Sequence, residues 1–176
     1  HYGVARDLWA ALKIRNNVIY DLPKIPISTN TNTLKPLQIK VTATNECPRY
    51  AGVLIQDVQV RTSPDWLCNA LKAIGQKPIN NIVDITNYCL HYYGQPLHAF
   101  DFEAITDRTI EVRNALPGEK FTTLDGIERT LSGNELMIAD TKYSLCMAGI
   151  YGGLSSGVNE NTTSILLESA YFNPRA

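Results

Sequence analysis

The chain has 176 residues, enough for one domain or one and a fraction at the usual size of about 150 residues per domain. Its content of 44% hydrophobic and 19% charged residues excludes a disordered chain and a collagen. The net charge is −1, from 16 Lys and Arg against 17 Asp and Glu, which argues against an autonomous nucleic-acid binder with a basic face.

Residues 3–13 have the spacing of an amphipathic helix. Because this helix has no obvious core partner, we interpret residues 1–20 as the C-terminal end of a preceding domain. Residues 21–36 contain three prolines and a run of Thr and Asn, which predicts a linker or surface arm. We assign residues 37–176 to a single module. The apolar face of the first helix comprises Val4, Leu8, Ala11 and Leu12.

Two strands and two helices are predicted next. Alternation predicts a half-buried strand at 37–43, and a longer apolar pattern predicts a second strand at 50–61. Ser63 is predicted as the N-cap of a helix that starts with Pro64 and ends at Gly75. Residues 82–93 predict another helix that stops at Gly94. Its predicted inward residues are Ile82, Ile85, Tyr88, Cys89 and Tyr92.

After residue 100 the pattern becomes one of short strands. Asp125-Gly126 between two apolar runs predicts a tight hairpin. Early helices followed by many strands indicate an α+β fold, a layered module with a β-rich core of sandwich-like sheets and flanking helices. The predicted strands are 109–113, 119–124, 127–131, 136–139, 145–150 and 164–168.

Several classes of site and location are excluded or disfavoured. The four cysteines form no CxxC pair and no Cys/His cluster, so we predict free buried thiols and no metal site. No apolar run reaches the length of about 18 residues typical of a membrane span. The N-terminus lacks both Met and a signal pattern, so we expect a fragment of a cytoplasmic protein.

A few polar residues are candidates for chemistry. Most single histidines are structural, but His98 follows a helix in a loop that leads into a strand, where sites are often found. Asn80 and Asp84 suit capping of the second helix, whereas Thr86 and Asn87 lie deeper within it and need other partners.

The glycine-rich stretch 148–157 and Glu168 complete the candidates. The stretch fits neither GxGxxG nor the P-loop pattern, so it predicts backbone that lines a pocket instead of a nucleotide fold. Glu168 ends an apolar run, as a paired strand-end residue or a pocket acid. No GxSxG motif is present. The residues alone therefore predict an α+β domain with a polar pocket around Asn87, His98 and Glu168.

Seven segments are recognisable together and in order. They resemble the B3/B4 module of the beta chain of bacterial phenylalanyl-tRNA synthetase, over roughly residues 45–176, and residues 1–20 resemble the end of the domain before it. The segments are Cys47–Gly52, Lys77–Tyr88, Gly94–Asp101, Leu124–Gly126, Ile138–Asp140, Ala148–Gly153 and Leu167–Phe172.

The resemblance implies an editing hydrolase. In that family the alpha chain makes Phe-tRNA and sometimes errs with tyrosine, and the module hydrolyses the Tyr-tRNA ester. Glu168 and Gly149 would recognise the tyrosine hydroxyl, and His98 would orient or deprotonate a water. Where the family usually has Arg, this chain has Lys77, a point charge in place of a bidentate fork. The implied catalytic residues are His98, Asn87 and Thr86, and the implied substrate-binding residues are Glu168, Gly149, Ala148 and Lys77.

The implied partners are the 3′ end of tRNA(Phe) carrying tyrosine and the alpha chain of an α2β2 enzyme, with no membrane. No cofactor is expected in this fragment, because the parent enzyme uses ATP and Mg²⁺ elsewhere. Two other functions remain open: a non-catalytic tRNA-docking or structural module with editing lost, and a small module that binds aromatic amino acids.

Overall fold

The computed structural model describes residues 1–16 and 37–174. The first helix, α1 (Tyr2–Asn16), is confirmed, but its predicted apolar face is not buried among these residues. Val4 and Leu8 are 67% and 58% exposed. The predicted linker 21–36 lies outside the described residues. The assignment of 1–20 to a preceding domain stays a prediction.

Three sheets form the β-rich part of the described residues. The three-stranded sheet has the antiparallel order β2-β10-β3, and the five-stranded sheet has the order β1-β4-β7-β8-β9, in which β1 and β4 are parallel. Strands β5 and β6 form a separate hairpin. The strands are β1 (Gln38–Val41), β2 (Arg49–Gln56), β3 (His98–Asp101), β4 (Thr109–Asn114), β5 (Lys120–Thr122), β6 (Glu128–Thr130), β7 (Leu136–Ala139), β8 (Ser144–Met147), β9 (Tyr151–Gly152) and β10 (Ser164–Tyr171).

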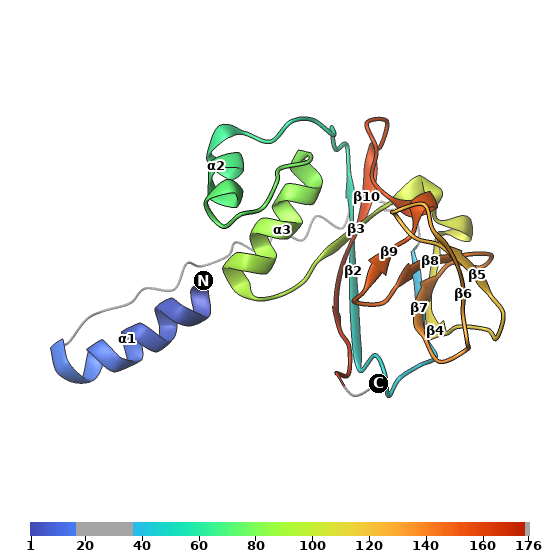
Figure 1. The fold of residues 1–176 in the computed structure, drawn as a ribbon, viewed down its shortest axis with the longest axis horizontal. Coiled ribbons are helices and arrows are strands. Elements are labelled where there is room, and N and C mark those ends of the chain that lie inside the picture. The colour runs from blue at the N-terminus through green and yellow to red at the C-terminus, as the bar shows by residue number, and fades with distance from the viewer. Residues whose placement is uncertain (17–36, 175–176) are drawn as a thin grey trace.

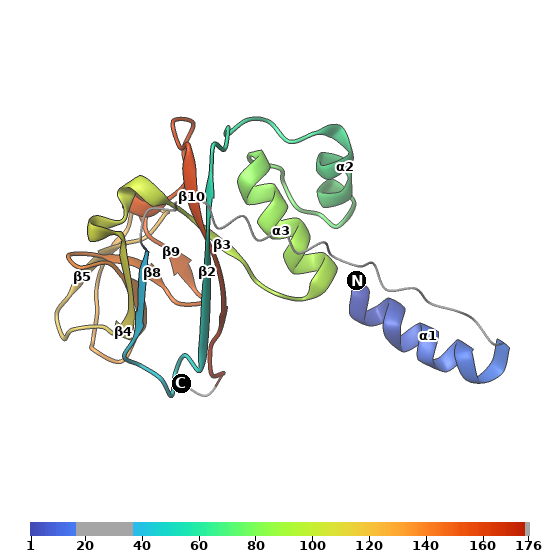
Figure 2. The ribbon, with the colours of Figure 1, turned by 180° about the vertical axis from the view of Figure 1, so that it is seen from behind.

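The two larger sheets pack face to face. Phe100 of β3 and Leu166 of β10 are fully buried against Ile110, Val112 and Ile138 of the other sheet. Helices α2 (Asp65–Ala73) and α3 (Asn81–Tyr93) lie on the opposite side of β2, β10 and β3. Figures 1 and 2 show these layers from both sides. The α+β prediction with sandwich-like sheets and flanking helices is therefore confirmed.

Helix α2 begins differently from the prediction. Pro64, not Ser63, is its N-cap, and no side chain caps it. Ser63 is buried, and its hydroxyl donates to the carboxylate of Asp84 on α3 at 2.5 Å. Burial explains the difference, because a buried Asp84 carboxylate needs donors more than a solvent-exposed helix end does.

Helix α3 begins and ends as predicted, but its predicted inward face is only partly buried. The Asn80 side chain accepts hydrogen bonds from the N–H groups of Ile82 and Val83, and Gly94 ends the helix at φ +80°. The buried residues of α3 are Ile82, Asp84 and Thr86, whereas Ile85 is 47% exposed. Tyr88 and Tyr92 stack on each other near the surface, so aromatic contacts replace core burial there.

The later strands follow the predicted order. All six predicted strands occur, and the hairpin at Asp125-Gly126 joins β5 to β6, with Gly126 at φ +79°. Strand β2 is shorter than predicted, because the chain turns at Asp57, which has φ +58°. The four cysteines are free; Cys47 and Cys146 are buried, and the other two are half-buried. Among the described residues, no helix is long and apolar enough to span a membrane.

Candidate functional site

The first cavity opens where the edge of the three-stranded sheet meets the turn between β8 and β9. It has a volume of about 230 Å³. His98 of β3 and Glu168 of β10 line it, and they lie directly opposite each other in the antiparallel register. Opposite residues of such a pair point to the same face, with Cβ atoms about 5 Å apart. Strand pairing thus brings together two predicted residues that are 70 positions apart in the sequence.

Glu168 is a buried carboxyl group that accepts one hydrogen bond from the described residues. Its Oε2 accepts the hydroxyl of Tyr50 at 2.9 Å, while its Oε1 accepts no hydrogen bond from the described residues. The side chain is 6% exposed and forms no ion pair with a described Lys or Arg. Burial raises the pKa of Glu168 to about 7, against the opposing effect of the Tyr50 hydrogen bond. The group can therefore change charge near neutral pH.

The raised pKa of Glu168 predicts how stability depends on pH. Between 4.5 and about 7, the folded chain keeps a proton on Glu168 that the unfolded chain has released. The free energy of unfolding therefore falls as pH rises through this window, by about 3 kcal/mol from this group. We expect Glu168→Gln to lose that part of the pH dependence in urea denaturation at pH 4.5 and pH 8.

The matched control is Glu160→Gln, at an exposed position on the loop before the same strand, where the side chain makes no hydrogen bond or ion pair to the described residues. It should keep the wild-type pH dependence. The lowered pKa of His98 acts in the opposite direction, since that stability is lost as pH falls below the ordinary value, but it is common to all three proteins. Equal pH dependence in wild type and Glu168→Gln would contradict the burial argument.

The imidazole of His98 is half-buried and lines the first cavity and a second one. Its ring lies edge-on to Phe100, with 4.4 Å between ring centroids, and makes no hydrogen bond to the described residues. Burial lowers the pKa of His98, so the ring is neutral at pH 7. A neutral ring with both nitrogens unoccupied can accept a proton from a bound water.

A second cavity, of about 390 Å³, lies between α3 and β3. Thr86 and Asn87 line it, and His98 lines both cavities. The Thr86 hydroxyl donates to the carbonyl of Val83 at 2.7 Å, so toward a ligand it can only accept. The Asn87 amide has no partner among the described residues and can both donate and accept. The histidine therefore stands between a carboxylate cavity and an amide cavity.

Of the three remaining predicted residues, one lines a cavity and two do not. Gly149 lines the first cavity at φ +69°. Ala148 lines neither cavity; its N–H donates to the carbonyl of Leu136, and its side chain packs on the core. Lys77 is exposed and lines neither cavity, but it lies three residues before Asn80, which lines the second.

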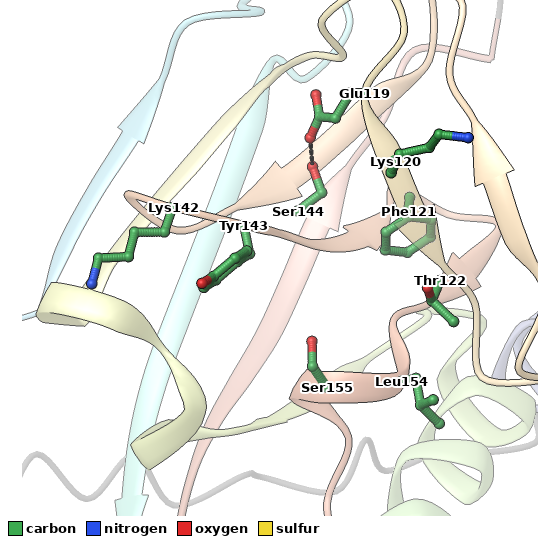
Figure 3. Close-up of a pocket in the computed structure, with 9 residues that line it drawn as sticks. All are labelled: Glu119, Lys120, Phe121, Thr122, Lys142, Tyr143, Ser144, Leu154 and Ser155. Carbon is green, nitrogen blue, oxygen red and sulfur yellow. Dashed lines mark hydrogen bonds between the residues drawn. The ribbon is translucent and has the colours of Figure 1, made fainter.

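A larger hollow lies elsewhere. It has a volume of about 510 Å³ and contains none of the predicted site residues (Figure 3). Its carboxylate, Glu119, is paired with Arg113 at 2.9 Å and accepts the Ser144 hydroxyl. The Arg113 hydrogen bond lowers the pKa of Glu119 to about 2, so this group is a fixed structural anion without a free role in proton transfer.

The structure adds neighbours that the sequence analysis missed. Cys146, Tyr151 and Phe172 line the first cavity, and Leu97 lines both. Burial raises the pKa of Cys146 to about 12, so it stays a neutral thiol. Tyr50 lies in one of the recognised segments, but no local pattern shows that its hydroxyl reaches a residue 118 positions away. Within residues 1–16 and 37–174, no three His, Cys, Asp or Glu side chains gather in a way that could hold a metal ion.

The B3/4 domain matches residues 46–176, which include both cavities. The chain belongs to the B3/4 domain family. The resemblance seen in the seven sequence segments is thereby confirmed. Lys77, Thr86, Asn87, His98, Ala148, Gly149 and Glu168 all lie within the B3/4 match.

The B3/4 chain is similar to much longer curated proteins. It is 52% identical over 176 residues to the phenylalanine–tRNA ligase beta subunit of Porphyromonas gingivalis. This match covers 99% of this chain and 21% of that protein. It is 48% identical to the corresponding subunit of Bacteroides fragilis, with the same coverage. The chain thus spans about a fifth of the length of these relatives.

A solved structure has the same fold. It is an N-terminal fragment of the phenylalanyl-tRNA synthetase beta subunit from Pyrococcus horikoshii, with a TM-score of 0.57 and 18% identity. The match covers 98% of this chain and 51% of that one. At this identity the likeness supports the B3/4 fold and leaves the roles of individual residues to their own geometry.

Proposed function

We propose that this B3/4 module hydrolyses the ester of Tyr-tRNA(Phe), as the post-transfer editing part of a phenylalanine–tRNA ligase beta subunit. The observation that carries the proposal is the position of His98 in the wall between two cavities. One cavity holds the carboxyl group of Glu168, and the other holds the Asn87 amide. The substrate has an amino-acid side chain at one end, a terminal ribose at the other and the ester between them. Two cavities that meet at His98 match this order.

The first cavity suits the tyrosine side chain. A phenolic hydroxyl can donate to Oε1 of Glu168, which accepts no hydrogen bond from the described residues. Phenylalanine would leave Oε1 of the buried carboxylate without a donor, a cost that gives sites of this kind discrimination of about 10⁴ or more. A purely hydrophobic pocket separates such isosteres by only about 100-fold. The N–H of Gly149 is a second candidate donor to the same phenol oxygen.

The second cavity suits the other end of the substrate. Thr86, as an acceptor, and Asn87, as donor and acceptor, can hold the ammonium group, the terminal ribose or the attacking water. His98 takes a proton from the water as its oxygen attacks the ester carbonyl. The same proton then passes to the departing ribose oxygen, so the products are tyrosine and tRNA. Positioning by these groups supplies much of the rate, and no covalent intermediate is needed.

The partners follow from this assignment. We propose that the 3′ end of tRNA(Phe) enters past the exposed Lys77, whose ammonium provides a point charge for a phosphate. The parent beta subunit would assemble with its alpha chain in the cytoplasm. ATP and Mg²⁺ would serve aminoacylation elsewhere in that enzyme, and no cofactor takes part in the hydrolysis proposed for this chain.

The test is deacylation of Tyr-tRNA(Phe) by the parent two-chain enzyme, with Phe-tRNA(Phe) as the comparison substrate. We expect fast hydrolysis of the first and slow hydrolysis of the second. Equal, background rates for both would favour the alternative, a docking or structural module with editing lost. Binding of free tyrosine without turnover would favour a module that only binds aromatic amino acids.

Gly149→Trp tests the position of the substrate pocket. A Cβ at Gly149 would meet Phe172 at 3.5 Å, an ordinary contact, so the indole can enter and fill a cavity of only about 230 Å³. We expect deacylation of Tyr-tRNA(Phe) to fall by about 100-fold or more, with aminoacylation unchanged. Rates are measured by loss of labelled tyrosine from the tRNA.

The control for Gly149→Trp is Gly118→Trp. Gly118 has a similarly positive φ of +81°, with no atom near an added Cβ, so it reproduces the backbone strain without filling the cavity. It should deacylate at the wild-type rate. Normal editing by Gly149→Trp would place the site elsewhere.

A further inference from the structure

Tyr50 is the group that approaches Glu168 most directly. In the sheet, Glu168 lies opposite Gly52, so Tyr50, two residues before Gly52, is its diagonal neighbour on the same face. The phenol ring packs against the core between the sheets, and its hydroxyl donates to Oε2 at 2.9 Å. The ring is therefore held by packing, and its hydroxyl is held at the carboxylate.

The hydrogen bond from Tyr50 has a fixed direction. Burial, together with the nearby Glu168 charge, raises the pKa of Tyr50 far above its ordinary value, so the phenol keeps its proton. A phenol that keeps its proton next to a carboxylate donates to it. One carboxylate oxygen is thus occupied within the chain, and Oε1 is the oxygen left for a ligand.

The other titratable groups around Glu168 do not supply a positive charge. His98 on β3 is neutral because burial lowers its pKa. Cys146 on β8 and Cys47 before β2 are thiols whose pKa values are raised by burial and by Glu168 itself. Among the described residues, Tyr50 is therefore the one neighbour that favours the ionised form of Glu168.

We propose that Tyr50 is a positioning residue for substrate selection, whose hydroxyl fixes one oxygen of Glu168 so that the other faces the phenol of a bound tyrosine. This inference rests on the proposed editing function. An ionised, oriented carboxylate can only accept hydrogen bonds, so it favours binding of a phenol and disfavours binding of a phenyl ring. A carboxyl group that is protonated and free to rotate discriminates less, because it no longer leaves a buried charge unpaired when phenylalanine binds.

The first experiment uses the full-length two-chain enzyme with Tyr50→Phe, which removes only the hydroxyl. Deacylation of Tyr-tRNA(Phe) and Phe-tRNA(Phe) is measured from pH 6 to pH 9, with spontaneous hydrolysis subtracted. At pH 7 we expect the Tyr-over-Phe ratio to fall about 10- to 100-fold, the value typical of a hydrogen bond to a charged group. Loss of the hydroxyl raises the pKa of Glu168 in Tyr50→Phe. The Tyr-over-Phe ratio of this variant should therefore still rise with pH above 8, where the ratio of the wild-type enzyme is already constant.

The matched control is Tyr171→Phe. Tyr171 lies on the same strand as Glu168, is 58% exposed, and lines neither cavity. It should keep both the wild-type ratio and the wild-type pH profile. A Tyr50→Phe enzyme with the wild-type ratio at every pH would overturn the proposal.

A second measurement separates this inference from the editing function. The carboxyl carbon of Glu168 is titrated by ¹³C NMR in the wild-type chain and in Tyr50→Phe. We expect the pKa of Glu168 to rise by about one unit or more in the variant, and an unchanged value would overturn the role of Tyr50. If the wild-type enzyme fails to prefer Tyr-tRNA(Phe), the editing proposal fails, and this titration still decides whether Tyr50 holds the carboxylate.

Discussion

Glu168→Ala is expected to abolish the preference for Tyr-tRNA(Phe) over Phe-tRNA(Phe). The carboxylate is a buried acceptor that lines the first cavity. Once it is removed, bound phenylalanine no longer leaves a buried charge without a hydrogen-bond donor. We expect the ratio of the two deacylation rates to fall by at least about 100-fold. The measurement is single-turnover deacylation by the parent two-chain enzyme with each charged tRNA.

Two further variants make the Glu168→Ala result specific. Glu168→Gln keeps the shape of the side chain but removes the charge, so it should also lose most of the selectivity. Glu160→Ala, at an exposed position, should keep all of it. An enzyme with Glu168→Ala that still clears Tyr-tRNA(Phe) at the wild-type rate, and spares Phe-tRNA(Phe), would remove Glu168 from substrate selection.

His98→Ala is expected to slow hydrolysis more than it weakens binding. General-base assistance contributes about 10²- to 10⁴-fold, so kcat for Tyr-tRNA(Phe) should fall within that range while KM stays near the wild-type value. The wild-type rate should fall as pH drops through the lowered pKa of His98, below its ordinary value of 6.5. The variant should lack this acidic limb.

The control for His98→Ala is His91→Ala on α3, which lines neither of the two site cavities. It should keep the wild-type kcat and pH profile. Equal losses of kcat and tyrosine affinity in His98→Ala would identify His98 as a structural residue that shapes the wall between the cavities. Circular dichroism of both variants separates either result from unfolding.

Glu168 and His98 also differ in the step that each should control. In the proposed mechanism, Glu168 governs which amino acid is accepted, so its loss should change the ratio of rates. His98 is proposed to govern the attack of water, so its loss should lower both rates together. Because the pKa of Glu168 is raised to about 7 and that of His98 is lowered, selectivity and rate should lose their pH dependence in different variants.

Local sequence patterns were sufficient for most of the secondary structure. The helix around Thr86 was predictable because Asn80 caps it and Gly94 ends it, and both effects act within a few residues. The hairpin at Asp125-Gly126 was predictable for the same reason. Ser63 was assigned wrongly, because its partner Asp84 is 21 residues away and buried, and no local pattern reports that contact.

The sequence identified the candidate site residues but did not show how the fold arranges them. The sequence analysis identified His98, Gly149 and Glu168 as candidates, and all three line one cavity. It also identified Thr86 and Asn87, which line the other. Ala148 and Lys77 line neither, since the first packs on the core and the second is exposed. No sequence pattern indicated that there are two cavities or that His98 is shared between them.

The α+β class, the order of most elements and the candidate polar groups could all be inferred from the sequence alone. These depend on periodicity, turns and caps, which are short-range. Only the tertiary structure decided that β10 pairs with β3 so that Glu168 faces His98, and that β2 brings Tyr50 to the same carboxyl group. The pKa shifts of Glu168 and His98 arise from burial, which depends on the packing of residues far apart in the chain.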